Sequence, residues 1–241
     1  MTTSELSAAT REKLMRVSTA TLCTALFKEG LRNQFIQDVG PVARKDKNMV
    51  GQAYTLRYIP AREDLNPISV FQDPTHPQRV GVEECPPGHV MVIDSRKDPR
   101  AASAGSILVT RMQQRGVAGV VTDGGFRDAP EIGALLIPCY HNRPSAPTNL
   151  TRHQAIELNT PIGCGDVAVF PGDVIVGDGE GVVVIPLHMV DAIAAEATEM
   201  TAFEDFVTER IQQGSTVIGL YPATTEEARA DYAAWRDRHG R

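Results

Sequence analysis

Two glycines, a phenylalanine, an arginine and an aspartate stand in a row at positions 124–128. The planar guanidinium group of Arg127 can bind two oxygens of a carboxylate or carbonyl compound at once. The carboxylate of Asp128 is the kind of ligand that a hard divalent cation prefers. Gly124 and Gly125 allow the backbone to approach a ligand closely. These residue types predict a site that binds a 2-oxo acid together with a metal ion.

A second candidate segment, residues 104–108, opens a predicted helix. The N–H groups of the first helical turn have no partner within the helix, so they form a ready site for an anion. Gly105 leaves room for a carboxylate to approach them. The two segments meet only if the start of this helix and the end of the following strand lie at the same edge of the sheet.

Structural roles compete with both interpretations. Asp128 and Glu131 have the spacing of a capping box, in which Asp128 would be the N-cap of the next helix. Arg127 could be a solvated arginine where that helix begins, and Ser103 could cap the helix that contains residues 104–108. A capping carboxylate can also face a metal ion with its second oxygen, so the two roles of Asp128 are compatible.

The elements that position these residues are predicted from apolar spacing. Residues 90–93 form a short buried strand, and a helix over 103–115 is expected to bury Ala104, Ile107, Leu108 and Met112 on one face before Gly116 ends it. Residues 117–122 form a strand that is apolar on both sides, which is typical of a strand covered on both faces. This order predicts a right-handed parallel crossover, followed by a sharp turn at 123–125.

The remaining chain predicts a single α/β domain over residues 1–241. A helix is expected over 4–29, a strand over 50–59, and a polar surface excursion rich in proline over 61–85. Three short strands at 167–170, 174–176 and 182–185 follow, separated by tight turns. The sheet is expected to be mixed and partly barrel-like. A helical extension over about 188–241, with Gly214 between its two helices, is expected to pack on a neighbouring subunit.

Composition and the other polar residues exclude several classes of protein. The formal charge of −6, from 24 basic and 30 acidic residues, gives no reason to expect nucleic-acid binding. No apolar run is long enough to span a membrane, and the polar N-terminus does not resemble a signal peptide, so a cytoplasmic location is expected. The four cysteines have no metal or redox spacing. The aspartates at 166, 173 and 178 are interpreted as turn residues, and histidines 76, 141 and 153 as structural.

Several segments resemble the RraA-like family, which includes 4-hydroxy-4-methyl-2-oxoglutarate/4-carboxy-4-hydroxy-2-oxoadipate aldolases and the protein regulator of ribonuclease E activity. The main one, at 104–128, is AGSILVTRMQQRGVAGVVTDGGFRD. Others are VGQA at 50–53, Pro87-Gly88, and PIGCGDVAVFPGDVIVGDGEGVVVIP at 161–186. The resemblance covers about 17–214 and implies a swivelling β/β/α fold, assembled as homotrimers or homohexamers with sites between subunits.

The resemblance also implies roles for individual residues. The backbone of Gly105, Ser106, Ile107 and Leu108 would bind the carboxylate of the pyruvyl group. Arg127 would contact the 2-oxo group, and Asp128 would be the direct protein ligand of Mg²⁺ or Mn²⁺. A glutamate of the neighbouring subunit's C-terminal helix, Glu199 or Glu204, would reach the metal through a water. The implied activity is that of a class II pyruvate aldolase with oxaloacetate decarboxylase activity.

Two departures from the family pattern and two alternatives bear on this expectation. Many aldolases of the family have an acidic residue where this chain has Ser106, and a hydroxyl group cannot act as the same base. Asp166 replaces a common glycine. The first alternative is a non-catalytic regulator that binds an RNA-processing enzyme, because fold does not determine function. The second is a lyase for a sugar-derived 2-oxo-3-deoxy acid.

Overall fold

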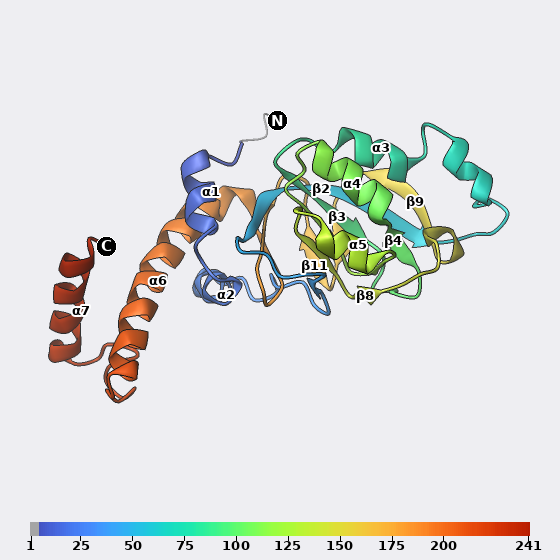
Figure 1. Cartoon of the computed structure of the whole chain (residues 1–241). Coiled ribbons are helices and arrows are strands. Elements are labelled where there is room, and N and C mark those ends of the chain that lie inside the picture. Colours follow the sequence, from blue (N-terminus) through green and yellow to red (C-terminus); the bar gives the residue numbers. More distant parts are fainter. Residues whose placement is uncertain (1–4) are drawn as a thin grey trace.

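A computed structural model describes residues 5–241 (Figure 1). The fold is mixed α/β, as predicted, with a nearly closed, barrel-like body of strands and two helices at the C-terminal end of the chain. Within the described residues, no helix is both long enough and apolar enough to span a membrane.

The main sheet has eight strands, seven of which follow the order β1-β7-β5-β3-β2-β12-β13, while β9 pairs with β2. Its centre is parallel: β2 pairs with β3, β3 with β5, and β5 with β7. The outer pairings are antiparallel. The predicted strands at 50–59 and 90–93 are therefore confirmed. The bounds are β1 Gly40–Pro41, β2 Met49–Pro60, β3 His89–Asp94, β5 Gly119–Thr122, β7 Cys139–His141, β9 His153–Leu158, β12 Val174–Gly177 and β13 Val182–Ile185.

Two small sheets complete the strands. One is a parallel sheet of β4 (Ala102–Ala104), β6 (Gly125–Phe126) and β8 (Arg143–Pro144). The other is a hairpin of β10 (Ile162–Cys164) and β11 (Val167–Val169). The three predicted C-terminal strands exist, but only β12 and β13 pair with each other. The predicted turn at 123–125 is confirmed as a bend at 123–124, and it leads from β5 of the main sheet into a short strand, β6, that was not predicted.

The predicted helix over 4–29 is two helices, α1 (Ala8–Leu14) and α2 (Thr19–Lys28); its predicted first residue, 4, lies outside the described residues. Each helix has its own N-cap, since the hydroxyl oxygens of Ser7 and Ser18 accept hydrogen bonds from backbone N–H groups three residues on. The apolar spacing of 4–29 indicated the buried face correctly but not the break, which the cap at Ser18 creates.

The excursion over 61–85 contains more structure than the sequence predicted. It holds a 3₁₀ turn, η1 (Ile68–Gln72), and a helix, α3 (Pro77–Glu84). Proline stands in the first turn of α3, where its missing N–H costs no helical hydrogen bond. The side-chain amide of Gln78 donates to the carbonyl oxygen of Ser103 (2.7 Å) and to the hydroxyl of Tyr58 (3.0 Å). These bonds anchor α3 against β4.

The remaining helices surround or extend the body. Helices α4 (Ser106–Gln114) and α5 (Ala129–Ala134) follow β4 and β6, and two 3₁₀ turns, η2 (Asn149–Thr151) and η3 (Leu187–Met189), precede β9 and α6. Helix α6 (Val190–Gln212) packs against α1 and α2 and then extends from the body to meet α7 (Glu226–His239) (Figure 1). The predicted helices after η3 are therefore confirmed.

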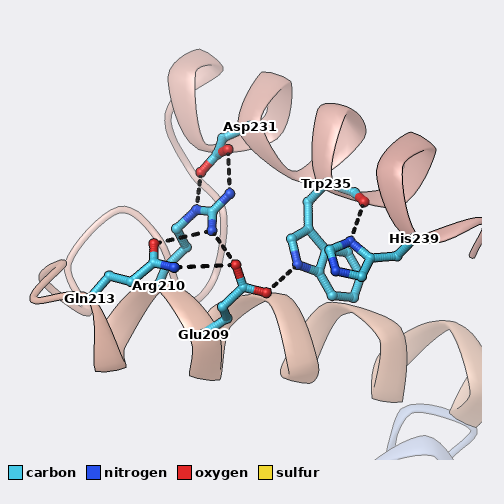
Figure 2. Close-up of polar contacts among 6 residues, drawn as sticks. All are labelled: Glu209, Arg210, Gln213, Asp231, Trp235 and His239. Carbon is cyan, nitrogen blue, oxygen red and sulfur yellow. Dashed lines mark hydrogen bonds and ion pairs between the residues drawn. The ribbon is translucent and has the colours of Figure 1, made fainter.

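A polar network joins α6 and α7 (Figure 2). The guanidinium group of Arg210 donates to both oxygens of Asp231, at 2.5 and 2.8 Å. The indole N–H of Trp235 donates to Glu209 Oε2 at 2.7 Å. Beneath these contacts Phe206, Val207, Leu220, Ala228 and Trp235 form a small apolar cluster. The two helices therefore hold each other by contacts separate from the core of the body.

Candidate active site

Two short parallel strands bring the two candidate segments together. In the pairing of β4 with β6, Ala104 lies opposite Phe126, and the N–H of Arg127 donates to the carbonyl oxygen of Ala104 at 3.1 Å. Parallel strands end at the same edge of a sheet, which is where α/β proteins place their ligands. Gly105 after β4 and Arg127 after β6 are therefore neighbours, as the sequence analysis required.

Asp128 does not form the capping box that its spacing with Glu131 suggested. Its backbone is left-handed, with φ 55° and ψ 40°, and its side chain makes no capping hydrogen bond to α5. Instead, its Oδ2 accepts hydrogen bonds from the N–H and the hydroxyl of Ser106, both at 3.2 Å. Aspartate tolerates this conformation better than most residues. The carboxylate thus faces the N-terminus of the preceding long helix, α4.

Helix α4 begins three residues later than predicted. Gly105 is its N-cap residue and has no side chain with which to cap it; Ser103 is buried in β4 and is not the cap. The sequence predicted that the four backbone N–H groups of residues 105–108 would be available to a ligand. The N–H of Ser106 instead donates to Asp128, so it is not available to a ligand. Ile107 and Leu108 follow in the first turn, whose N–H groups lack partners within the helix.

The buried face of α4 also differs from the prediction. Val109 and Met112 are its buried residues, whereas the side chain of Ile107 is 82% exposed. Met112 is buried and Leu108 is partly buried against the core, as expected, so the difference is that Val109 takes the buried position expected for Ile107. Ile107 lines the cavity while most of its side chain is exposed to solvent.

A glycine is required at position 105 by the side chains of the other segment. A Cβ atom there would lie 2.8 Å from Cγ of Arg127 and 3.0 Å from Oδ2 of Asp128. Contacts this short between non-bonded atoms force the neighbouring groups to move. Gly105 therefore allows the aliphatic stem of Arg127 and the carboxylate of Asp128 to lie directly over the start of α4.

These residues line a cavity of about 220 Å³. Gly105, Ile107, Leu108, Arg127 and Asp128 form one side of it. The Nε atom of Arg127 lies 3.7 Å from Oδ2 of Asp128, and both side chains are partly exposed. The volume is at or below the lower end of the usual range for ligand sites, which suits a small acid. The guanidinium group, the carboxylate and the helix start therefore share one opening.

Buried hydroxyl groups hold the two strands behind the cavity. Ser103 Oγ lies 2.7 Å from Ser95 Oγ and 2.6 Å from Thr122 Oγ1. The N–H of Gly124 donates to Thr122 Oγ1 at 3.0 Å, and a Cβ at position 124 would meet Ser95 Cβ at 2.6 Å. The crossing from β5 to β6 is therefore too close to its neighbours for any residue but glycine.

Asp123, which the sequence analysis placed in a turn, is a buried positioning residue. Its carboxylate accepts hydrogen bonds from the backbone N–H groups of Ser95, Lys97 and Gly165. Burial raises the pKa of Asp123 to about 6, although these donors act in the opposite direction. The carboxylate joins the loop after β3 to the β10–β11 hairpin and so fixes the frame from which β4 and β6 extend.

One wall of the cavity was not predicted residue by residue. It comes from the excursion over 61–85 and from the loop before β9, and their polar side chains show no recognisable spacing. The only hint was that long polar excursions are often functional. The lining residues from these segments are Phe71, Gln78, Arg79, Thr148 and Asn149.

The donors present fit a hard cation that keeps most of its own water. Within the described part of the chain, no three histidine, cysteine, aspartate or glutamate side chains are grouped to hold a metal. Asp128 would therefore be one protein ligand among water and substrate oxygens, which is how Mg²⁺ is often bound. The contacts that Asp128 makes go to Oδ2, which leaves Oδ1 for such an ion.

Glu199 and Glu204 lie on α6 and do not line the cavity of their own chain. Glu199 accepts a hydrogen bond from Arg236 of α7 at 2.7 Å. Glu204 accepts one from the hydroxyl of Thr21 of α2 at 2.8 Å. The role expected of either residue requires a neighbouring subunit, and that expectation stays a prediction.

Four of the other histidine and cysteine side chains, His141, His153, Cys85 and Cys139, are buried. Burial lowers the pKa of His141 to about 4, and burial together with Arg96 lowers that of His153 to about 4. Burial also raises the thiol pKa of Cys85 and of Cys139 to about 12. Neutral buried imidazoles and thiols do not provide a nucleophile for the cavity.

A family model described as RraA-like (Aldolase/RraA) matches residues 19–184, which is more than half of the chain. The chain belongs to the RraA-like family. The matched residues include every residue that lines the cavity, whereas α6 and α7 lie beyond the match.

Relatives and solved structures agree with this membership. A Halalkalibacterium halodurans protein, named as a candidate 4-hydroxy-4-methyl-2-oxoglutarate aldolase, is 33% identical over 138 residues, which are 57% of this chain and 65% of that protein. The crystal structure of Streptomyces coelicolor RraAS2, described as an unusual member of the RNase ES inhibitor RraA protein family, has 27% identity and a TM-score of 0.74, covering 84% of this chain and 97% of that one. An uncharacterised Pseudomonas syringae protein (22% identity, TM-score 0.76, 94% and 99% covered) shares the fold.

Proposed function

We propose that this RraA-like protein is a divalent-cation-dependent carbon–carbon lyase. Its substrate would be a 4-hydroxy-2-oxo acid, cleaved to pyruvate and a second carbonyl compound. The observation that carries the proposal is the hydrogen bonding of Asp128 to Ser106 at the start of α4, with Arg127 beside it in one cavity. The name of the Halalkalibacterium relative supports the same reaction class.

Each group has a role in binding the pyruvyl end of the substrate. The amides of Ile107 and Leu108 bind the carboxylate, aided by the positive end of the helix dipole. Arg127 binds the 2-oxo oxygen through its guanidinium group. Asp128 holds the cation, Mg²⁺ or Mn²⁺, which when bound supplies positive charge beside the same oxygen.

The reaction breaks the bond between C3 and C4. The C4 hydroxyl gives its proton to a water molecule and C4 leaves as a carbonyl carbon. The electron pair of the broken C3–C4 bond becomes the C2=C3 double bond of the pyruvate enolate, and the 2-oxo oxygen takes the negative charge. The enolate then takes a proton at C3 and becomes pyruvate. Arg127 donates hydrogen bonds to the oxygen on which negative charge develops, and such donors are worth most in the transition state. Decarboxylation of oxaloacetate passes through the same enolate and is an expected second activity.

The test is pyruvate release from 4-hydroxy-2-oxo acids and from oxaloacetate in the presence of Mg²⁺. Asp128→Ala and chelated wild-type protein should each lose activity by about 10²-fold or more, because charge stabilisation of the enolate disappears. Asp64→Ala removes an exposed carboxylate that pairs with Arg62 on the surface and serves as the matched control. Undiminished activity in Asp128→Ala and in the chelated sample would exclude the role given to Asp128.

We also propose that the chain assembles as a homotrimer or homohexamer in which α6 and α7 contact a neighbouring subunit. Glu199 or Glu204 would then approach the neighbour's Asp128. The exposed side chains of Val217, Ile218 and Tyr221 beside this pair of helices support an interface there.

One observation favours a second candidate function. RraAS2, which is similar to this chain over most of its length, is described as belonging to a family of inhibitors of RNase ES. The chain would then regulate an RNA-processing enzyme by contact. An Arg127→Ala, Asp128→Ala double variant separates the functions, because inhibition of ribonuclease activity through a surface should survive the loss of both cavity side chains.

A further inference from the structure

Arg79 is a second arginine in the cavity of Arg127 and Asp128. It follows Gln78 on α3, whose hydrogen bond to the carbonyl oxygen of Ser103 in β4 holds this part of α3 against the cavity that both residues line. Its guanidinium group stacks on the ring of Phe71, with Cζ 4.6 Å from the ring centroid. Arginine stacked in this way keeps its N–H donors free in the plane of the fork.

The charge of Arg79 is not offset by a neighbouring carboxylate. Among residues 5–241, its side chain makes no ion pair, whereas those of Arg62, Arg100 and Arg111 each do. Of the charged side chains that line the cavity, Arg127 and Asp128 offset each other. Arg79 is therefore the surplus positive charge, and a bound divalent cation would add to it.

A buried amide group in the same cavity adds a hydrogen-bond donor to the positive charge of Arg79. Asn149 lies in the same wall and is 5% exposed; its Oδ1 accepts a hydrogen bond from Thr148, and its Nδ2 has no partner in the described part of the chain. A buried donor without a partner costs free energy that a ligand oxygen can recover. The part of the cavity lined by Arg79 and Asn149 therefore favours a second anionic group.

We propose that Arg79 is a specificity-determining residue that binds a second carboxylate of the substrate, the one carried by C4. This rests on the proposed function, since the first carboxylate and the 2-oxo group occupy the Arg127 side. The substrate would be a 2-oxo diacid, and the second carboxylate would leave with the second product. A sugar-derived 2-oxo-3-deoxy acid carries hydroxyl groups at this end and would not neutralise Arg79.

The test compares pairs of acids that differ only at this end. For binding, 2-oxoglutarate is compared with 2-oxopentanoate by calorimetry in the presence of Mg²⁺. For turnover, 4-hydroxy-2-oxoglutarate is compared with 4-hydroxy-2-oxopentanoate by pyruvate release. The wild-type protein should prefer the diacid of each pair by roughly 10- to 100-fold, because a charge-assisted, paired hydrogen bond is lost with the monoacid.

Arg79→Met keeps an apolar side chain against Phe71 and removes the charge. It should abolish the preference by raising Kd and KM for the diacids, while values for the monoacids stay within about twofold. Arg79→Lys should restore part of the preference, since it restores the charge without the planar fork. Arg62→Met, which removes an exposed, ion-paired arginine of the same segment, should leave the preference unchanged.

The experiments distinguish an incorrect role for Arg79 from an incorrect proposed reaction. If no acid releases pyruvate but calorimetry still shows a diacid preference that Arg79→Met removes, the role of Arg79 stands and the proposed reaction does not. If the wild-type protein binds both acids of the pair equally, or if Arg79→Met weakens both equally, the assignment of Arg79 is wrong.

Discussion

Asp128 adopts a backbone conformation that few residues other than glycine adopt, and the position of its carboxylate follows from it. With φ 55° the side chain turns away from α5, the helix that it precedes, and meets Ser106 of α4. Strained backbone conformations of this kind are often found at functional sites. This position of the Asp128 carboxylate also requires a glycine at position 105, because a Cβ atom there would collide with Asp128 and Arg127.

Gly105→Ala tests this complementarity. The added methyl group would overlap Cγ of Arg127 and Oδ2 of Asp128, so both groups must shift by several tenths of an ångström. We expect kcat/KM for pyruvate release to fall by about 10- to 100-fold, since small displacements of catalytic groups cost that much. Stability should fall by no more than roughly 1–3 kcal/mol.

Gly163→Ala is the matched control, because nothing lies within 4 Å of the Cβ position there. Both variants are compared by steady-state kinetics and thermal unfolding. Equal activity of Gly105→Ala and the wild-type protein would show that the start of α4 does not position Arg127 and Asp128.

The pairing of α6 with α7 is a small unit within the fold. Its apolar cluster includes Phe206 and Trp235. Figure 2 shows the polar contacts that Glu209 and Arg210 of α6 make with α7. Because α7 extends beyond the body (Figure 1), it can open without unfolding of the main sheet.

Trp235→Ala should release α7 locally. Removing a buried tryptophan typically costs roughly 3–5 kcal/mol, which exceeds what so small a cluster is expected to supply. Limited proteolysis should cut within residues 213–225 much faster than in the wild-type protein, while the main thermal transition of the body changes little. Asp237→Ala, at an exposed position of α7, is the control.

The same variant tests the proposed assembly. The wild-type protein should have a mass in solution of three or six times 26.1 kDa, and Trp235→Ala should lower it if α7 contacts a neighbour. A wild-type mass equal to that of one chain would contradict the assembly and with it the roles expected of Glu199 and Glu204.

The molecule as a whole carries buried ionisable groups that link its stability to pH. His141 stacks on Phe126 and His153 on Tyr58, and both are nearly inaccessible to solvent. Their pKa values of about 4 lie below the ordinary 6.5. Asp123 has the opposite shift, to a pKa of about 6 from 3.8.

Stability should therefore fall as the pH is lowered from about 6.5 to 4. In that range the unfolded chain protonates both histidines while the folded chain does not, so each histidine favours unfolding. Asp123 acts in the opposite direction, because the folded state holds its proton up to about pH 6. Burial also lowers the pKa of His76 and raises those of Asp94 and Asp173, so smaller effects act in both directions. The large shifts of His141 and His153 together exceed that of Asp123, and the net effect is a loss of stability in acid.

His153→Gln should reduce the pH dependence. The free energy of unfolding, measured by urea titration at pH 7 and pH 5, should differ less between the two pH values in the variant than in the wild-type protein. An identical difference in both proteins would show that His153 is not buried in its neutral form.

Sequence reasoning predicted the parts of the site that depend on local order. The sequence alone identified the apolar runs of β3 and β5. It also identified the glycines at 105 and 124 and the adjacent Arg127 and Asp128. The spacing of apolar residues predicts which side of an element is buried, and the prediction is most accurate for long elements such as β2 and α6. It does not report breaks such as the one that Ser18 makes, since a cap changes one residue and leaves the spacing intact.

Tertiary structure alone decided which groups face one another. The carboxylate of Asp128 had two acceptable partners, the amides of α5 and those of α4, and its local spacing favoured α5. The parallel pairing of β4 with β6 brought α4 close enough to bind it instead. Arg79 entered the cavity because Gln78 bonds to a strand 25 residues away, and contacts over such distances leave no pattern in a single sequence. The sequence thus determined which chemical groups are available, and the pairing of distant strands decided which of them act together.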